Sequence, residues 1–208
     1  MRFLATVCVL SFQLILCARG IVDVADLAEG YKKEGLIPDV LDTAPKNFLP
    51  VSYNNKEFGF ASELTPTEVK DAPTHIGWGL DSSSFYTLIM NDPDAPSRQD
   101  PKMREFLHWA VVNIPGDDFS KGETLAEYMG AGPPQGTGLH RYIITLYRQP
   151  SKLTFDEKPM NNLSIEGRVN FNLRKFIEKY KLDEHVAGNM FKAQYDDYVP
   201  EFYNKMGM

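Results

Sequence analysis

The sequence Asp92-Pro93-Asp94-Ala95-Pro96 constrains the fold of this chain most, because two prolines stiffen one acidic turn. Proline fixes its own φ and restricts the residue before it, so both aspartates are held in a nearly predetermined geometry. The apolar, β-prone run Phe85 to Met90 precedes the turn and predicts a buried strand. The pattern therefore predicts two carboxylates at the mouth of a strand, although most turns of this composition are purely structural.

Two later stretches each add a histidine to this pair of carboxylates. Arg104 to Ile114 predicts a second strand that carries His108, and Gly132 to Tyr142 is a Gly/Pro-rich loop that enters a third strand and carries His140. Both imidazoles can donate hydrogen bonds to an anion, more strongly when protonated, and either aspartate can orient a ring or raise its pKa. Because glycines lack a Cβ, the loop lets backbone N–H groups approach a ligand. A small phosphate or carboxylate suits this set.

Taken in order, the motifs DPDAP, REFLHW and GPPQGTGLHRY resemble the signature of the phosphatidylethanolamine-binding protein family, also called the Raf kinase inhibitor protein family. The resemblance runs from about Gly30 to the C-terminus and implies a large antiparallel sheet packed on a smaller one, with C-terminal helices beside a pocket. Phe106 stands where many animal members carry Trp, which alters the pocket wall. The pocket residues that the resemblance implies are Asp92, His108, Pro134, His140, Tyr142 and Tyr203, with Asp94 and Gly132 beside them.

The predicted fold is mainly β, an antiparallel two-sheet sandwich with short peripheral and C-terminal helices. Apolar positions at helical spacing predict a surface helix within Val22 to Glu34 and an amphipathic helix after Asn170, whose basic residues form a solvated face. A last strand is expected near Met190 to Tyr195. A short helix from Tyr198, capped by Asp197, then carries aromatic residues toward the body.

The first twenty residues are typical of a secretory signal peptide. A basic start at Met1-Arg2 is followed by the apolar run Phe3 to Leu16 and by small residues. Cleavage after Ala18 and after Gly20 are both compatible with this pattern, and the apolar run is too short for a confident membrane span. We therefore predict a signal peptide over residues 1–20, a single domain over residues 21–208, and an extracellular protein.

Composition excludes several functional classes. Both cysteines, Cys8 and Cys17, lie in the predicted signal peptide, so the mature chain has no cysteine nucleophile, disulfide or cysteine-based metal site. The net charge of −6 argues against nucleic-acid binding and does not favour adsorption to acidic lipid. In an exported chain the sequon Asn162-Leu163-Ser164 is a glycan acceptor.

These observations predict a secreted binding protein for a phosphate-containing, phosphatidylethanolamine-like headgroup or a small anion, with modulation of signalling as an associated role. Relatives implicated in kinase and serine-protease control leave a protease or signalling protein as an alternative partner, and serine-protease inhibition as the second function. A hydrolase or metalloenzyme is less favoured, because His108 and His140 lie on separate strands without local ligand spacing and no evident Ser or Thr nucleophile stands in the motifs. We therefore expect no catalysis, metal or cofactor.

Overall fold

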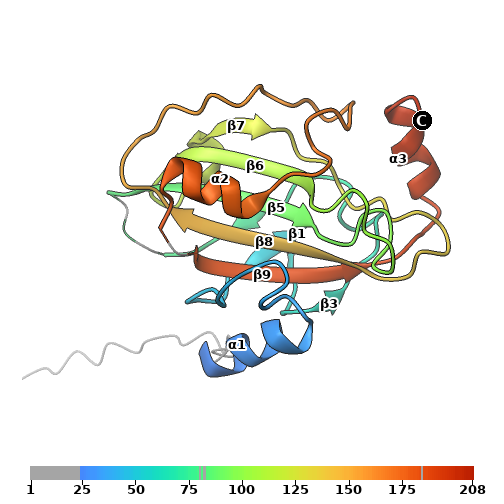
Figure 1. Cartoon of the computed structure of the whole chain (residues 1–208), viewed down its shortest axis with the longest axis horizontal. Helices are drawn as coiled ribbons and strands as arrows, with labels where there is room; N and C mark the ends of the chain where they lie inside the picture. The colour runs from blue at the N-terminus through green and yellow to red at the C-terminus, as the bar shows by residue number, and fades with distance from the viewer. Residues whose placement is uncertain (1–23, 80, 82, 184) are drawn as a thin grey trace, which may run out of the picture.

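A computed structural model describes residues 24–79, 81, 83–183 and 185–208 of the chain. Within these residues it has a six-stranded sheet, a three-stranded sheet and a few short helices (Figure 1). The prediction of a mainly β, two-sheet fold is confirmed. The predicted signal peptide, residues 1–20, lies outside the described residues.

The large sheet has the strand order β3-β9-β8-β5-β6-β7. Its strands are β3 (Ser62–Glu63), β5 (Phe85–Asp92), β6 (Phe106–Pro115), β7 (Glu123–Ala126), β8 (His140–Arg148) and β9 (His185–Ala193). Neighbouring strands are antiparallel except for β3 and β9, which are parallel. The expectation of a wholly antiparallel sheet is therefore wrong at this edge, because β3 reaches β9 through most of the chain instead of through a hairpin.

The small sheet has the order β2-β1-β4, formed by β1 (Val51–Tyr53), β2 (Lys56–Glu57) and β4 (His75–Ile76). The turn between β1 and β2 consists of Asn54 and Asn55, which both have positive φ, at 50° and 63°. Asparagine tolerates this left-handed region better than most residues, and the right-handed twist of a hairpin favours it. This two-residue turn joins β2, an edge strand, to β1 in the middle of the small sheet.

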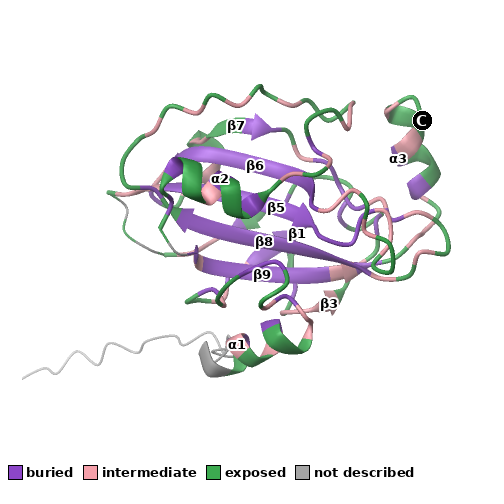
Figure 2. Ribbon diagram, viewed as in Figure 1, coloured by how far each residue is buried: buried purple, intermediate pink, exposed green. Residues whose placement is uncertain are grey.

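The central strands of the large sheet are buried on both faces (Figure 2). Leu88 and Leu146 join Val51 and Ile76 of the small sheet in one hydrophobic cluster. Their neighbours along the strands point the other way, as the pleat requires, and Ile89 belongs to a second cluster beneath the helices. The sheet therefore serves as a rigid middle layer.

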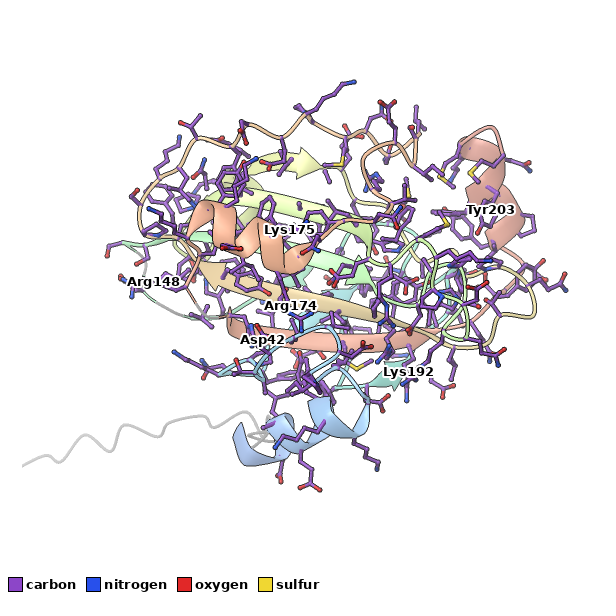
Figure 3. The ribbon with its side chains drawn as sticks, in the orientation of Figure 1. Asp42, Arg148, Arg174, Lys175, Lys192 and Tyr203 are labelled. Atoms are coloured by element: carbon purple, nitrogen blue, oxygen red, sulfur yellow. The ribbon has the colours of Figure 1, made fainter. Side chains whose placement is uncertain are left out.

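The helices cover the outer face and one end of this sheet. They are α1 (Val24–Lys33), the 3-10 turn η1 (Phe119–Lys121), α2 (Leu173–Tyr180) and α3 (Val199–Lys205). The side chain of Asn172 caps α2 by accepting the Lys175 N–H at 2.9 Å. On its solvated face Arg174 pairs with Asp42, with 3.0 Å between Nη2 and Oδ1. Figure 3 shows Arg174 and Asp42 near α2, far from Tyr203 of α3.

Two predicted details near the C-terminus are wrong. Asp197 does not cap α3: Tyr198 is the N-cap residue without a side-chain bond, and Asp196 accepts the Tyr198 N–H at 3.0 Å instead. Strand β9 runs from His185 to Ala193, five residues earlier at its start than expected. The cause is Gly188, a residue that disfavours strands in sequence patterns but is required here by close packing.

We predict that Gly188→Ala destabilises the fold by roughly 1–3 kcal/mol, because the core cannot absorb an added methyl without moving its neighbours. A Cβ at this position would lie 2.5 Å from Cγ of Pro45 and 2.7 Å from the hydroxyl of Tyr31. Urea unfolding measures the difference. Gly59→Ala is the matched control, since its Cβ would meet only the Ser62 hydroxyl at 3.7 Å; equal stability of the two variants would contradict the packing argument.

Candidate functional site

A cavity of about 230 Å³ lies where β5 ends and β6 and β8 begin. The antiparallel pairing brings these strand ends together, and α3 closes the same end of the sheet (Figure 1). Its polar lining residues are Asp92, His108, His140, Tyr142 and Tyr203. Apolar side chains form most of the remaining wall: Ala95, Pro96, Met103, Phe106, Pro134, Ile165, Phe202, Met206 and Met208.

The Asp92 carboxylate accepts hydrogen bonds from the backbone of the acidic turn and from the imidazole of His140. Its Oδ2 lies 2.8 Å from Nδ1 of His140, and its Oδ1 accepts the Asp94 N–H at 2.6 Å. Because a carboxylate only accepts hydrogen bonds, Nδ1 of His140 must carry the hydrogen. The predicted orientation of an imidazole by an aspartate is thus made by Asp92.

Thr137 occupies the other nitrogen of the His140 ring and was not predicted. Its hydroxyl lies 3.0 Å from Nε2 of His140 and 2.8 Å from the carbonyl oxygen of Pro134. A hydroxyl, an imidazole and a carboxylate in sequence are the elements of an activated nucleophile, but Thr137 is not among the residues that line the cavity. We therefore assign it to holding the glycine-rich loop on the ring. Because Thr137 lies only three residues before His140 in the sequence, this contact could have been predicted from the spacing.

His108 has other hydrogen-bond partners than His140. Its Nδ1 lies 2.8 Å from the carbonyl oxygen of Met129, and its ring packs on those of Phe106 and Tyr142 at 4.8 and 5.1 Å between centroids. Burial lowers the pKa of His108 to about 4, although the charge of Asp92 opposes this. The sequence allowed either imidazole to donate more strongly in its protonated form, but His108 is neutral near pH 7, because the cost of burying its charged ring exceeds the stabilisation by Asp92.

Tyr142, Tyr203 and Gly132 join the glycine-rich loop to the sheet and to α3. Burial raises the pKa of Tyr142 well above its usual value, so the phenol keeps its hydrogen. The Tyr203 hydroxyl donates to the carbonyl oxygen of Gly132 at 2.9 Å. A Cβ on Gly132 would lie 2.3 Å from the ring of Phe202, so this glycine permits the close approach of α3.

The structure places Asp94 outside the cavity lining, in a buried ion pair. Its carboxylate receives Nη2 and Nε of Arg141 at 2.6 and 2.8 Å, and both side chains are almost completely buried. The guanidinium also donates to the carbonyl oxygens of Glu34 and Gly35, just after α1. Asp94 therefore anchors the acidic turn to β8 and α1.

The predicted glycosylation site, Asn162, lies outside the cavity. Asn162 is exposed on the segment before α2, and its N–H donates to Glu127 at 3.0 Å. Among the described residues, no group of three or more His, Cys, Asp or Glu side chains is placed to hold a metal ion. No helix in the described part of the chain is long and apolar enough to span a bilayer.

Most of the apolar residues that line the cavity were not predicted from the sequence. Met103, Ile165, Phe202 and Met206 come from three separate segments. The spacing of Phe202 and Met206, four residues apart on a helix, was a usable signal. For the other two, neither spacing nor residue type distinguishes a cavity wall from an ordinary core.

Comparisons with known proteins show which family and which structures the chain resembles. The family model "Phosphatidylethanolamine-binding protein" matches residues 42–192. The chain is 44% identical over 171 residues to "Putative odorant-binding protein A5" of Drosophila melanogaster, covering 82% of this chain and 81% of that protein. It is 49% identical to the solution structure of CG7054, with a TM-score of 0.67, covering 82% of this chain and 97% of that one.

A third comparison concerns a structure with a bound enzyme. The chain is 26% identical to carboxypeptidase Y inhibitor, solved in complex with its cognate proteinase. The TM-score is 0.70, and the match covers 85% of this chain and 98% of the inhibitor.

We predict that acid destabilises the fold through His108. Its pKa is about 4 in the folded chain and about 6.5 in an unfolded one. Because the folded pKa is the lower, the contribution is fully present above pH ~6.5 and is lost as the pH falls toward 4, by an amount on the order of 3 kcal/mol. Urea unfolding from pH 7.5 to 4.5 measures this loss.

The variant His108→Asn retains an N–H for the Met129 carbonyl but cannot titrate, so it should show a shallower loss of stability in acid. The control His75→Asn changes an exposed histidine of β4 and should keep the pH dependence of the wild type. An identical slope in His108→Asn would show that other groups cause the acid effect.

Proposed function

Because this chain belongs to the phosphatidylethanolamine-binding protein family, we propose that its cavity binds a small ligand with a phosphate-like polar head and an apolar body. One observation carries the proposal: Asp92, His108, His140 and Tyr142 converge on a cavity whose other walls are apolar. Binding sites of this composition use few polar groups to orient a ligand and apolar surface for affinity.

The size of the cavity sets the part of a ligand that it can enclose. A volume of about 230 Å³ accommodates a head and a short apolar group, whereas the chains of a phospholipid must extend outside. Met208 lines the cavity and is 61% exposed, so it forms an apolar rim where such a chain would leave. Methionine side chains adapt to ligands of different shape, and Phe106 supports them with a flat aromatic wall.

The names of the relatives are consistent with such a ligand. One is named for binding odorants, and the matching family model is named for binding phosphatidylethanolamine. Small odorants and lipid headgroups share a compact polar group next to apolar surface. Our proposal assigns the same kind of ligand to this chain and treats it as a binding protein without catalysis or a cofactor.

We further propose that the chain is secreted, because residues 1–20 have the order of a signal peptide: a basic start, an apolar run and small residues. Cleavage after Ala18 or Gly20 would lie before α1, the first element that the structure describes. Extracellular export would expose Asn162 to glycosylation, for which its exposed position is suitable.

Inhibition of a serine protease is the second candidate. It is supported by the likeness to carboxypeptidase Y inhibitor at 26% identity. The two functions differ in the surface that they use, since an inhibitor buries an exposed patch against an enzyme, whereas a ligand fills the cavity. Loss of carboxypeptidase Y activity on addition of the purified protein, undiminished when the cavity is mutated, would favour inhibition.

We predict that His140→Ala weakens binding of phosphoethanolamine by roughly ten- to a hundredfold, the loss expected when one or two hydrogen bonds between a displaced Asp92 and the ligand are not made. The substitution removes the ring that holds Asp92 and Thr137 in place. Isothermal titration calorimetry at pH 6 measures the affinity. His75→Ala, on the exposed side of β4, is the control that should bind like the wild type. Equal affinity in His140→Ala would place the ligand elsewhere.

We predict that protein collected from the medium of expressing animal cells begins after residue 18 or 20 and carries a glycan at Asn162. Mass spectrometry of the intact chain, before and after glycosidase treatment, gives both the start and the glycan mass. The matched control is Ser164→Ala, which destroys the sequon and should abolish the mass shift. Protein retained in the cytosol with Met1 present would contradict export.

A further inference from the structure

The hydrogen-bonding capacity of the cavity restricts its ligands more than the residue types do. Both ring nitrogens of His140 contact protein groups, at 2.8 Å from Asp92 and 3.0 Å from Thr137. The Tyr203 hydroxyl donates to the Gly132 carbonyl oxygen. Both oxygens of Asp92 also accept from protein groups, but each carboxylate oxygen has a second lone pair and can accept again. Among the described polar side chains of the lining, Asp92, His108 and Tyr142 therefore remain to meet a ligand.

The tautomer of His108 follows from its partner. A carbonyl oxygen only accepts hydrogen bonds, so Nδ1 must carry the hydrogen that is donated to Met129 at 2.8 Å. In the neutral ring, Nε2 then has a lone pair and acts as an acceptor. The Asp92 carboxylate is also an acceptor, whereas the Tyr142 phenol retains a hydrogen to donate. These three side chains thus present two acceptors and one donor to a ligand.

A fully ionised oxyanion does not match this arrangement, because it has acceptors only. Its oxygens would face the lone pair of His108 and the charge of Asp92, and a buried acceptor without a donor costs binding free energy. An oxyacid that retains one hydrogen can donate to Nε2 of His108 while another oxygen accepts from Tyr142.

We propose that this pocket binds small oxyacids in their hydrogen-bearing form, such as a phosphate monoester monoanion with one P–OH group, in preference to fully ionised anions and to phosphate diesters. The proposal rests on the proposed function and specifies the head of the ligand. A diester phosphate has no P–OH, so intact phospholipid phosphate lacks the hydrogen that His108 requires.

The groups around His108 keep its ring neutral over the relevant pH range. Asp92 from β5 favours a charged ring, whereas burial, Arg168 and His140 disfavour it, and the resulting pKa is about 4. Arg168 comes from the segment before α2, and its Nη1 donates to the carbonyl oxygens of Leu107 and His108 at 3.0 and 3.1 Å. The remaining neighbours are the phenols of Tyr142 on β8 and Tyr203 on α3, both of which have raised pKa values.

A matched pair of ligands tests the proposal with the wild-type protein. At pH 5, phenyl phosphate and methyl phenyl phosphate each carry about one negative charge, but only the monoester has a P–OH group. We expect the monoester to bind at least tenfold more tightly at pH 5. Its affinity should then fall about tenfold per pH unit above its second pKa, near 6, because its dianion has lost the hydrogen.

Calorimetry in two buffers of different ionisation enthalpy measures the protons taken up on binding. The monoester should take up about one proton per site at pH 7.5, and the diester none. Equal affinities of the two compounds at pH 5, with about one proton taken up by the diester, would show that His108 becomes charged and would overturn this inference alone. Binding of neither compound would overturn the proposed function and this inference together.

A variant isolates the acceptor nitrogen. His108→Asn retains an N–H for the Met129 carbonyl oxygen but removes Nε2, so we expect the monoester and the diester to bind within about threefold of each other. His75→Asn, on β4, should keep the wild-type preference. An unchanged preference in folded His108→Asn would overturn the assignment of His108, and if this variant does not fold, the wild-type comparison decides.

Discussion

The buried ion pair between Asp94 and Arg141 is the interaction on which the geometry of this protein depends. It joins the acidic turn after β5 to β8, and through the carbonyl oxygens of Glu34 and Gly35 it also joins both to α1. A buried charge is tolerated when its hydrogen bonds are satisfied, and losing one partner typically costs 3–5 kcal/mol. The pair therefore holds the turn in one position, which in turn positions Asp92.

The consequence is a division of labour between two aspartates that are two residues apart. Because Asp94 is committed to Arg141, Asp92 is left to accept from His140 and to line the cavity. Thr137 completes the chain of contacts by joining His140 to the glycine-rich loop. Contacts within the protein thus hold the polar end of the pocket, so binding need not include the entropic cost of ordering these side chains.

The family assignment and the physical character of the cavity support each other. The chain belongs to the phosphatidylethanolamine-binding protein family, and its cavity combines a compact polar end with a wall of methionine and aromatic side chains. Helix α3 supplies much of that wall, and its close contact with the loop depends on Gly132. The wall and the polar end are formed by different residues, so a substitution in the wall can change ligand preference without changing the polar end.

The sequence by itself determined the central strands, the amphipathic helix α2 and the acidic turn, which are local features, because apolar periodicity and proline stiffness act between residues near each other in the chain. Its resemblance to the family indicated the pocket residues Asp92, His108, His140, Tyr142 and Tyr203. The apolar surface of Met103, Ile165 and Met206, and the parallel pairing of β3 with β9, could not be read from the sequence.

Only the tertiary structure decided that Asp94 pairs with Arg141, that the His108 ring is neutral, and that Thr137 holds His140. Each depends on a partner or on burial supplied by another segment: Asp94 finds Arg141 across 47 residues, and His108 is buried beneath side chains from β5, β8 and the segment near Arg168. Desolvation and long-range pairing exist only once those segments have packed together, so the chemistry of this site is a property of the folded chain.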